Sequence, residues 1–527
     1  AMRNIGRIDP TDILDAIAEG AYSGLAKALF EMTPDQVLDE VAASGQRGRG
    51  GAGFNTARKW RSCRKAEGER KFVLCNGDEG DPGAFKDRSI MEGDPHSVLE
   101  GMVIGAFAVG AHEGYIYVRD EYPLAVKRFG IAIKQAESAG ILGHNVMDSG
   151  FGFGIYIVEG AGAFVCGEAS ALMYSIEGKR GMPRVRPPHS TESGLWGKPT
   201  LLNNVKTFAS VPLIVEKGAD WFAGIGTEGS KGTALFALAG KVAHTGLVEV
   251  PMGTTLRQVV YDVGGGMPGK RAFKGVQIGG PSGGCLPASL LDTPIDFDSL
   301  TSAGSMMGSG GMIVLDDDTC MVEFSRYFLT FAAAESCGKC VPCRVGGQRL
   351  LEALTRIGEG QGTRKDLEII KDVSNQMMTS SLCGLGQRTP GPVLAALRFF
   401  EDEFITHIDE KLCRAGQCRA LVRARCVNTC PANVDTPAYL ALVAQGRYTE
   451  GLAIHRRRNP FALVCGRACP AFCETKCRRG EIDEPVAIRL VKRFMADHEF
   501  EKHWQPEPLG TAAERAAAAQ RKVAVIG

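Results

Sequence analysis

The strongest constraint on this chain is the segment ESCGKCVPCR, residues 335–344, which places three cysteines very close together. Cys337, Cys340 and Cys343 follow a C-x2-C-x2-C pattern, and Cys383, in SSLCGLG, is the obvious fourth thiol. Three close thiolates and one remote thiolate are a common ligand set for a [4Fe–4S] cluster. Structural zinc sites more often pair two short arms of ligands, so the spacing favours the cluster over zinc.

Length, charge and cysteine content limit the kinds of protein that this chain can be. The length of 527 residues suggests roughly three or four domains. The net charge of +1 indicates neither a nucleic-acid partner nor an acidic substrate. No apolar run is long enough to span a bilayer, and we expect no secretion signal. Since 12 of the 17 cysteines lie between Cys337 and Cys477, we expect reduced thiols that hold metals in a cytoplasm-like compartment.

The last residues of the sequence read KVAVIG, residues 522–527. A short apolar run that reaches a glycine is typical of the first strand of a dinucleotide-binding unit, just before its phosphate loop. Since that loop is absent here, we expect a further nucleotide-binding domain in the full polypeptide.

A glycine-rich segment near the N-terminus is a candidate phosphate loop. RGRGGAGF, residues 47–54, matches G-x-G-x-x-G from Gly48. It follows a predicted helix instead of a strand, so an ordinary Rossmann turn is not indicated. Glycine loops let main-chain N–H groups surround a phosphate, and Arg58 and Lys59 add positive charge nearby. The alternative is a mobile surface loop.

Polar residues follow a predicted strand in FVLCNGDEGDPGAFKDR, residues 72–88. The strand brings Asn76, Asp78 and Glu79 to its end, where ligand-facing side chains are common. An ordinary polar turn is an equal alternative on this segment alone. A second strand, glycine turn and helix over residues 154–183 places further glycines at a predicted helix N-terminus.

Five motifs in this order resemble the NADH-oxidising flavoprotein subunit of respiratory complex I: GRGGAGF, NGDEGDPGAFKDR, GAGAFVCGEASAL, PPHSTESGLWGKPTLLNNVKT and ESCGKCVPCR. The soluble relatives in bifurcating hydrogenases and NAD-linked formate dehydrogenases look closer still. The resemblance covers roughly residues 20–410. It implies that NADH stacks on FMN near Phe54 and Glu79, that Glu79 and Glu168 are catalytic, and that the four-cysteine cluster takes electrons from the flavin. It implies the following binding residues for FMN and the nucleotide: Gly48, Arg49, Gly50, Gly51, Gly53, Phe54, Lys59, Asn76, Asp78, Glu79, Gly167, Glu168, Asn203 and Asn204.

The chain departs from the family at three positions. Asn55 replaces a proline, Ala169 replaces a second glutamate after Glu168, and His189 replaces a phenylalanine that helps to sandwich the adenine. The last two departures touch the nucleotide pocket, so the choice between NADH and NADPH stays open.

Two further domains follow the flavin region. Residues 233–300 alternate apolar runs with turns and resemble the soluble-ligand-binding β-grasp module of the same family. Residues 319–410 contain long helical apolar patterns, which predict a bundle around the four-cysteine cluster.

Eight cysteines lie beyond residue 410. The stretch that begins CPANVDTPAYLALV resembles the N-terminal iron–sulfur domain of the glutamate synthase small subunit, whereas HIDEKLCRAGQCRALVRARC resembles a zinc-binding linker of bifurcating hydrogenase flavoprotein subunits. The resemblances imply zinc at His407, Cys413, Cys418 and Cys426, a second [4Fe–4S] cluster at Cys430, Cys469, Cys473 and Cys477, and a spare Cys465. The rival assignment gives all eight cysteines to clusters. The isolated cysteines are expected to be packing residues: Cys63, Cys75, Cys166, Cys285 and Cys320.

These inferences give an α/β fold class with five segments. They are an FMN- and NAD(P)H-binding Rossmann-like domain (1–230), a small β-grasp domain (231–318), a four-helix bundle with a [4Fe–4S] cluster (319–410), a helical Cys-rich zinc and iron–sulfur domain (411–510) and the start of a nucleotide-binding domain (511–527).

The predicted function is that of an FMN-dependent NAD(P)H:acceptor oxidoreductase subunit, which moves electrons between NAD(H) and iron–sulfur clusters. The terminal acceptor and flavin-based bifurcation stay open. The resemblance implies a cytoplasmic hetero-oligomer with a [2Fe–2S] thioredoxin-like subunit and further iron–sulfur or catalytic subunits. The alternative is an iron–sulfur scaffold that docks other redox subunits and oxidises nothing itself.

Overall fold

The computed structural model describes residues 1–502 and 511–519. The chain packs as two compact units, Ala1–Asp409 and Glu410–Gly527. The KVAVIG segment and its predicted strand lie outside the described residues. Within the described ranges, no helix has the length and apolar character that crossing a membrane requires.

Capping side chains begin the N-terminal helices of the first unit. Thr33 forms a capping box with Gln36 at the start of α3, and Pro34 occupies the first turn. Asn55 caps α4 by accepting a hydrogen bond from Arg58 N at 2.9 Å. The helices are α1 (Ile13–Ala18), α2 (Ser23–Glu31), α3 (Pro34–Ala43) and α4 (Thr56–Lys65).

A four-stranded parallel sheet with strand order β3-β2-β1-β4 forms the centre of the flavin region. The chain runs from β1 to β2 and β3 on one side and later places β4 on the other side of β1. In open α/β sheets, ligands bind beyond the carboxyl ends of the strands where the strand order reverses, which here is between β1 and β4. The strands are β1 (Phe72–Gly77), β2 (Glu113–Arg119), β3 (Gly154–Gly160) and β4 (Thr200–Asn204).

Helices bury this sheet inside a hydrophobic core. α6 is buried around nearly its whole circumference and packs on α9 so closely that a Cβ on Gly101 would lie 2.1 Å from Phe208 O. Trp60 and Phe129 are completely buried in the same core. The remaining helices of the domain are α5 (Lys86–Gly93), α6 (Pro95–Val109), α7 (Pro123–Ser138), α8 (Ala169–Ile176), α9 (Val205–Lys217) and α10 (Ala219–Ala223).

A second, five-stranded sheet has strand order β6-β5-β9-β7-β8. Only the β5–β9 pair is parallel, so the sheet is mixed, and its core contains Phe236, Val276 and Met312. This confirms the predicted β-rich domain. Its elements are β5 (Thr233–Gly240), β6 (Gly246–Pro251), β7 (Phe273–Ile278), β8 (Gly284–Pro287), α11 (Phe297–Ser302) and β9 (Gly311–Asp316).

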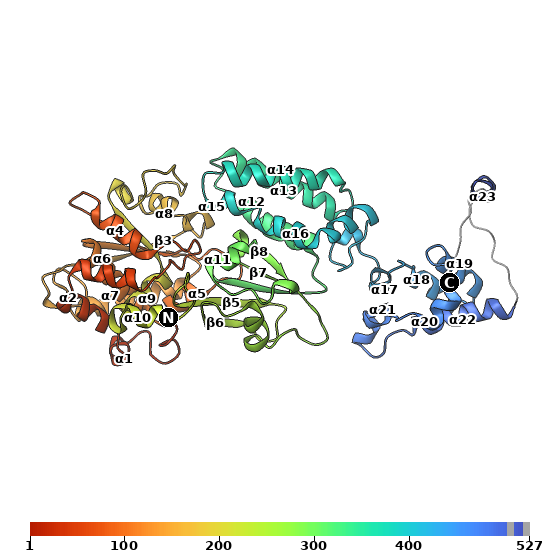
Figure 1. The fold of residues 1–527 in the computed structure, drawn as a ribbon, viewed down its shortest axis with the longest axis horizontal. Coiled ribbons are helices and arrows are strands. Elements are labelled where there is room, and N and C mark those ends of the chain that lie inside the picture. Colours follow the sequence, from red (N-terminus) through yellow and green to blue (C-terminus); the bar gives the residue numbers. More distant parts are fainter. Residues whose placement is uncertain (503–510, 520–527) are drawn as a thin grey trace. The chain divides into compact units, whose positions relative to one another are not determined.

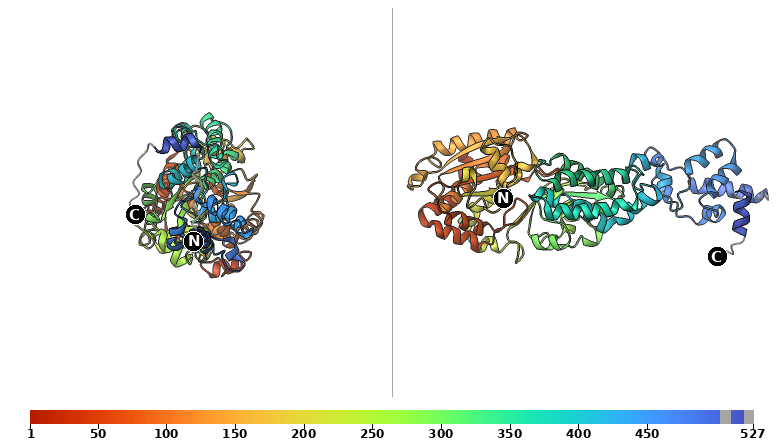
Figure 2. Two further views of the ribbon diagram at one scale, coloured as in Figure 1. Left: turned by 90° about the vertical axis from the view of Figure 1, so that its right-hand side faces the viewer. Right: turned by 90° about the horizontal axis from the view of Figure 1, so that it is seen from above.

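Four long helices and one short helix complete the first unit. Figures 1 and 2 show them beside the second sheet, where α16 packs on β8. α13 packs between α12 and α14, and α16 packs on α12, as the predicted bundle requires. The helices are α12 (Met321–Ala334), α13 (Val341–Gly358), α14 (Arg364–Ser380), α15 (Gly384–Arg388) and α16 (Gly391–Ile405).

The second unit is helical, with a small core that includes Tyr439, Leu452 and Met495. Its helices are α17 (Arg425–Asn428), α18 (Thr436–Ala444), α19 (Tyr448–Arg456), α20 (Ala462–Ala468), α21 (Phe472–Thr475), α22 (Ile488–Glu501) and α23 (Ala512–Ala519). The fold class is thus the one predicted, while the domain boundaries stay predictions.

Candidate functional site

The carboxyl ends of β1 and β4 bring predicted ligand residues together. The strands pair in parallel so that Asn76 lies opposite Asn204 and Cys75 lies opposite Asn203. Asn76 Nδ2 donates to Gly167 O at 2.9 Å, which ties the end of β1 to the segment before α8. Sequence spacing alone could not show this contact, because it joins segments 91 residues apart.

Asn203 and Asn204 point in different directions. Asn204 Nδ2 donates to Asp87 Oδ2 at 2.7 Å, and its own Oδ1 caps α9. Asn203 is buried, and in the amide orientation that satisfies its neighbours it accepts from Trp60 Nε1 at 2.9 Å. Adjacent residues of a strand face opposite sides of the sheet, so only one of the two amides can lie on the ligand side.

Asp78 carries a buried carboxylate that has no hydrogen-bond partner for either oxygen among the described residues. Arg119 Nε lies 3.7 Å from Oδ1. Burial raises the pKa of Asp78 to about 7, against the lowering effect of Arg119. Unpartnered buried carboxylates are costly, so this one indicates a ligand with hydrogen-bond donors directly beyond β1.

The glycine loop lies against the same sheet edge and has little room for side chains. A Cβ on Gly50 would lie 3.2 Å from Asn204 Cβ. Gly53 has a φ of +62°, and a Cβ there would lie 2.5 Å from the Phe297 ring. Beside the loop, Nη1 of the buried Arg49 has no hydrogen-bond partner among the described residues. A bare backbone and an unpartnered guanidinium nitrogen suit a phosphate.

Lys59 and Phe54 lie at the start of α4. Lys59 Nζ donates to Leu202 O at 2.9 Å, and burial lowers the pKa of Lys59 to about 8. The Phe54 ring is 49% exposed, with the Lys59 ammonium 5.9 Å from its centroid. An exposed aromatic face beside a cation is suited to stack on a flat ring system.

The side chain of Glu79 faces the protein. Its carboxylate is fully buried and accepts hydrogen bonds from Asp87 N and Arg88 N at 3.1 Å, at the start of α5. Lys86 Nζ lies 3.9 Å away. Burial raises the pKa of Glu79 to about 7, with Asp87 adding to the effect. The predicted contact between Glu79 and the nucleotide therefore stays a prediction, and the structure adds a helix-capping role.

The carboxylate of Glu168 has partners for both of its oxygens. Oε2 accepts from Ser170 N at 2.9 Å and from Ala171 N at 3.1 Å and so caps α8. Oε1 forms an ion pair with Arg186. The side chain is 17% exposed, so it borders the site without being sealed off from it.

The residues around β1 and β4 fit FMN. The glycine loop and the unpartnered guanidinium nitrogen of Arg49 suit the phosphate, and the unpartnered carboxylate of Asp78 suits the ring system. The assignment of individual residues to FMN stays a prediction; the predicted residues near this edge of the sheet include the glycine loop, Asn76, Asp78 and Asn204.

All four predicted cluster cysteines line one small cavity of the bundle. Cys340 and Cys383 precede the first residues of α13 and α15, and Cys343 lies in the first turn of α13. Ser336 Oγ lies 3.3 Å from Cys343 Sγ. Helix N-termini favour negative charge, so four thiolates around one cavity fit a [4Fe–4S] cluster.

The cluster loop is tied to the flavin region. Phe164 N donates to Glu335 Oε2 at 3.0 Å, and Lys339 Nζ donates to Pro183 O at 2.6 Å. Glu168 is close enough to Cys383 to contribute to the raised pKa of that thiol, although burial is the main cause. The segment from β3 to Pro183 therefore connects the candidate flavin site with the cluster cavity.

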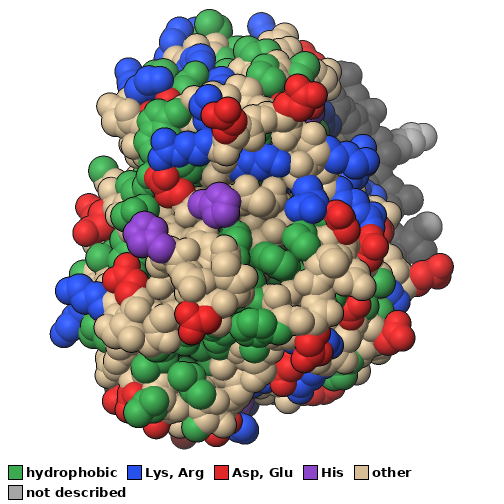
Figure 3. All heavy atoms as spheres, turned by 90° about the vertical axis from the view of Figure 1, so that its left-hand side faces the viewer, with side chains coloured by type: hydrophobic (Ala, Val, Ile, Leu, Met, Phe, Trp, Pro, Cys, Tyr) green, Lys and Arg blue, Asp and Glu red, His purple; other side chains and the backbone are tan. Residues whose placement is uncertain are grey.

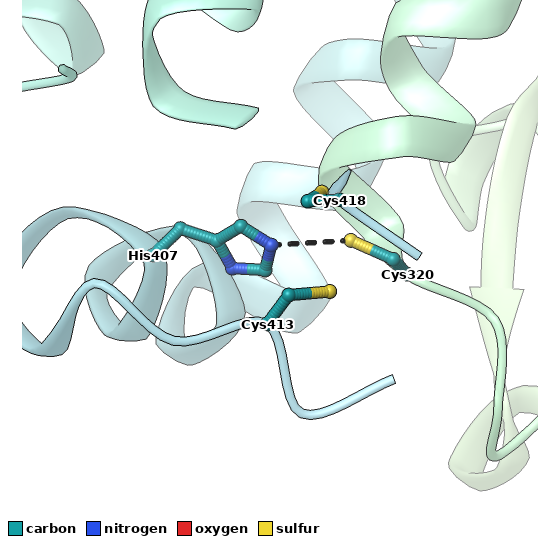
Figure 4. A group of neighbouring side chains, drawn as sticks. All are labelled: Cys320, His407, Cys413 and Cys418. Atoms are coloured by element: carbon teal, nitrogen blue, oxygen red, sulfur yellow. Dashed lines mark hydrogen bonds between the residues drawn. The ribbon is translucent and has the colours of Figure 1, made fainter. Parts of the chain in front are cut away.

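A second group of metal ligands differs from the prediction in one member. Cys320, His407, Cys413 and Cys418 are buried, and their ligand atoms all lie within 4.8 Å of one another (Figure 4). His407 Nε2 lies 3.3 Å from Cys320 Sγ, while His407 Nδ1 contacts Glu403 O at 2.7 Å.

That second contact fits a metal ligand, because a bond to Nδ1–H leaves Nε2 free to bind metal. Three thiols and one imidazole fit tetrahedral zinc. Cys320 stands where we predicted Cys426. Sequence reasoning missed it because it is an isolated cysteine, 87 residues from His407, with no spacing partner.

The remaining cysteines of the second unit gather around its core. Cys426 lies on α17, where burial raises its pKa and Cys477 adds to the effect. Burial raises the pKa of Cys473 to about 11, and Glu474, Cys430 and Cys469 add to it. The predicted second-cluster cysteines thus influence one another, and Cys426 lies near them. Cys465 Sγ accepts from Asn459 Nδ2 at 3.4 Å.

Comparison with known proteins matches four sequence families along the chain. They are the Nuo51 FMN-binding domain at residues 41–213, the SLBB domain at 235–286, the NADH-ubiquinone oxidoreductase-F iron–sulfur binding region at 323–407, and dihydropyrimidine dehydrogenase domain II with a 4Fe–4S cluster at 398–504.

Several known proteins are similar over most of the chain. The NADP-reducing hydrogenase subunit HndC of Solidesulfovibrio fructosivorans is 54% identical over 80% of this chain and 86% of its own length. The F 2 subunit of the NADH-quinone oxidoreductase of Rhizobium meliloti is 45% identical over 78% of this chain and 98% of its own length.

A solved NAD⁺-reducing [NiFe]-hydrogenase in the H2-reduced state contains a chain with a similar fold. It matches with a TM-score of 0.68 and 38% identity, over 74% of this chain and 65% of that chain. The candidate flavin site lies within the FMN-binding match, and the four cysteines that line the bundle cavity lie within the iron–sulfur match. The chain therefore belongs to the NuoF/HndC family of NAD(P)H-oxidising flavoprotein subunits, which bind FMN and [4Fe–4S] clusters.

Proposed function

We propose that this chain oxidises a nicotinamide nucleotide at FMN beyond the carboxyl ends of β1 and β4, and passes the electrons to the four-cysteine cluster. The observation that carries the proposal is the buried carboxylate of Asp78 just beyond β1, neither oxygen of which has a hydrogen-bond partner among the described residues, although Arg119 Nε lies 3.7 Å from Oδ1. When bound, FMN accepts a hydride from the nicotinamide and releases its two electrons singly.

The protein's own contribution is positioning and electrostatics. The glycine loop and Arg49 are suited to hold the phosphate, and Asp78 and Asn76 are suited to fix the ring system. Phe54 offers an exposed face against which the nucleotide can stack. Hydride transfer needs no general base, so the site is complete without a catalytic triad.

Electrons leave along the segment that joins the two sites. Phe164 in the flavin region donates a hydrogen bond to Glu335 of the cluster loop. Glu168, also in the flavin region, lies close enough to Cys383 to affect its pKa. We assign a second [4Fe–4S] cluster to the cysteines around Cys473 as an onward relay. We assign zinc to the group that contains Cys320 and His407, where it stabilises the fold without carrying electrons.

The relatives suggest the setting in which the chain works. They are subunits of hydrogenases and of NADH-quinone oxidoreductases, so this chain is a subunit of such a multi-subunit complex. We propose a cytoplasmic hetero-oligomer that includes a [2Fe–2S] thioredoxin-like subunit and further iron–sulfur or catalytic subunits.

The test is anaerobic mixing of the purified chain with NADH and, separately, with NADPH. The expected result is bleaching of FMN absorbance followed by reduction of the cluster. If neither nucleotide bleaches bound FMN, the chain is the non-catalytic scaffold of the alternative hypothesis. Metal analysis should give one zinc and about eight cluster irons, since each [4Fe–4S] cluster contributes four. About twelve irons without zinc would assign the zinc ligands to a third cluster.

A further inference from the structure

The glycine loop is closed at its base and braced by a side chain of its own. Gly48 N donates to Phe54 O at 2.8 Å, and Arg47 and Asn55 form an isolated β-bridge. Across the loop, Arg47 Nε donates to Gly53 O at 2.7 Å. The shape of the loop therefore depends on where the Arg47 guanidinium lies.

The Arg47 guanidinium is held by the second-sheet segment, residues 229–316, which contains the second sheet and α11. Its Nη1 donates to Gly229 O at 3.2 Å and forms an ion pair with Asp298 Oδ2 at 3.2 Å. Its central carbon lies 4.3 Å from the centroid of the Phe297 ring. A loop of the flavin region is thus fixed by contacts with a segment that begins 182 residues further along the chain.

The Phe297 ring also forms a wall against the loop. A Cβ on Gly53 would lie 2.5 Å from this ring, and the Arg49 guanidinium carbon lies 5.8 Å from its centroid. Phe297 is 5% exposed in the core of the second sheet, and its N–H donates to Ser230 Oγ at 3.3 Å. Because Asp296 caps α11, the position of the ring is set within its own segment and not by the loop.

The contacts of Arg47 differ in how strongly water weakens them. The Asp298 side chain is 70% exposed, and exposed ion pairs contribute little. The hydrogen bond to Gly53 O is partly buried, and the ring that the guanidinium covers is buried. An arginine can make both contacts at once because its planar group has donors in fixed directions, whereas a lysine ammonium is a single point charge.

Surface charge does not explain how a phosphate would be recognised here. The net charge of the chain is +1, and Figure 3 shows Asp and Glu side chains interspersed with Lys and Arg side chains on one face. Charges of both signs largely cancel at a distance, so recognition depends on the loop itself. Several main-chain N–H groups must converge on one phosphate, so a small change in loop shape weakens several hydrogen bonds together.

We propose that the second-sheet segment completes the FMN site, with Arg47 and Phe297 as positioning residues that hold the glycine loop in the shape that binds the FMN phosphate. The inference rests on the FMN site of the proposed function and extends it to Phe297, which lies outside the FMN-binding match at residues 41–213. It predicts a specific loss: without these contacts the protein keeps its affinity for the flavin ring but no longer favours a flavin that carries a phosphate.

The test compares FMN with riboflavin, which has the same ring system and ribityl chain but no phosphate. Quenching of flavin fluorescence measures the binding of each compound to the full chain after its own flavin has been removed. Wild type should bind FMN at least about tenfold more tightly than riboflavin, as charged hydrogen bonds to a phosphate imply. Arg47→Met and Phe297→Leu should each remove most of that preference and leave the affinity for riboflavin unchanged.

Three further variants separate geometry from charge and from core packing. Arg47→Lys keeps the charge and should still lose most of the preference, because one ammonium cannot replace the planar group. Asp298→Asn should keep the affinity for FMN within about threefold, because the ion pair is exposed. Phe273→Leu on β7 is the matched control, since that ring packs against the same core and lies beside Tyr261.

Two results would overturn the inference. One is an Arg47→Met variant that binds FMN as tightly as wild type. The other is equal weakening of FMN and riboflavin by Arg47→Met, because the contact would then support only the fold. If Phe297→Leu does not fold, Arg47→Met decides alone, since that side chain is 25% exposed.

Mixing the wild-type chain with NADH and NADPH separates this inference from the proposed function. If neither nucleotide bleaches bound FMN while Arg47→Met loses the preference for FMN, the proposed function fails and the positioning role stands. If FMN bleaches while Arg47→Met binds FMN like wild type, the proposed function stands and the positioning role fails.

Discussion

Replacing Glu79 separates a structural role from a nucleotide-binding role. In Glu79→Ala, the N–H groups of Asp87 and Arg88 at the start of α5 lose their acceptor. Asp87 is buried, so its N–H cannot turn to water, whereas Arg88 is exposed and recovers part of its loss. A buried unsatisfied donor costs about 1–3 kcal/mol, which suggests a total loss of about 2–4 kcal/mol.

The expected change in melting temperature follows from the size of the unit. Unfolding entropy is about 2.1 cal/mol/K per residue, or about 0.9 kcal/mol/K for the 409 residues of Ala1–Asp409. The loss should therefore lower the Tm of the first unit by about 2–5 °C. Glu79→Gln keeps one acceptor oxygen and should lose about half as much. Glu69→Ala, which removes an exposed carboxylate from the same region, sets the baseline.

The assay combines differential scanning fluorimetry of the FMN-loaded chain with the KM for the nicotinamide nucleotide. The structure predicts that Tm decreases from wild type to the glutamine variant to the alanine variant. An unchanged Tm together with a raised KM would refute the reasoning, because it would mean that the Glu79 carboxylate faces the nucleotide and not α5.

Three other changes test separate parts of the structure. Gly53→Ala should lower FMN occupancy and reduce the free energy of unfolding by about 2–4 kcal/mol, because Gly53 has a positive φ and a Cβ there would clash with Phe297. Absorbance measures the flavin content, and full occupancy in the variant would contradict the prediction. Cys320→Ser should abolish zinc binding while Cys426→Ser leaves it intact, as measured by elemental analysis; the reverse pattern would restore the original ligand set. Lowering the pH from 7 to 5 should cost about 1–2 kcal/mol through His96, because burial holds its pKa at about 4 while the unfolded side chain takes up a proton near 6.5. Urea unfolding of wild type and His96→Asn should show this pH dependence reduced in the variant, and identical slopes would exclude His96 as its source.

The predictions from sequence succeeded where the information was local. The strand that carries Asn76 near its carboxyl end and the long helices of the bundle follow from short apolar runs and from hydrophobic periodicity. The C-x2-C-x2-C spacing indicated a shared metal site, and Cys340 and Cys383 do line one cavity. Each of these features depends on residues close in the chain or on one strong motif.

Features that depend on tertiary contacts could not be predicted from the sequence. Cys320 joins His407 because α12 and α16 pack together, and an isolated cysteine carries no signal of that packing. The direction of Glu79 depends on where α5 begins relative to β1, and the direction of Asn203 depends on Trp60. Residue identity predicted polar groups at the sheet edge, but only packing decides which of them face a ligand.

The hydrogen bonds that tie the flavin region to the cluster loop also bear on how such a protein can be rearranged. The rate of electron transfer decreases steeply with distance. When the flavin site and the cluster are held within one packed unit, the folding of that unit sets their distance and therefore the rate of the first transfer. The contact from Phe164 N to Glu335 and that from Lys339 to Pro183 both lie within Ala1–Asp409. We expect that the segment after Cys418, the last residue of the buried group that contains Cys320 and His407, could then be exchanged without changing the first transfer. The fold thus fixes the first electron transfer within one unit and leaves the segment that follows Cys418 replaceable.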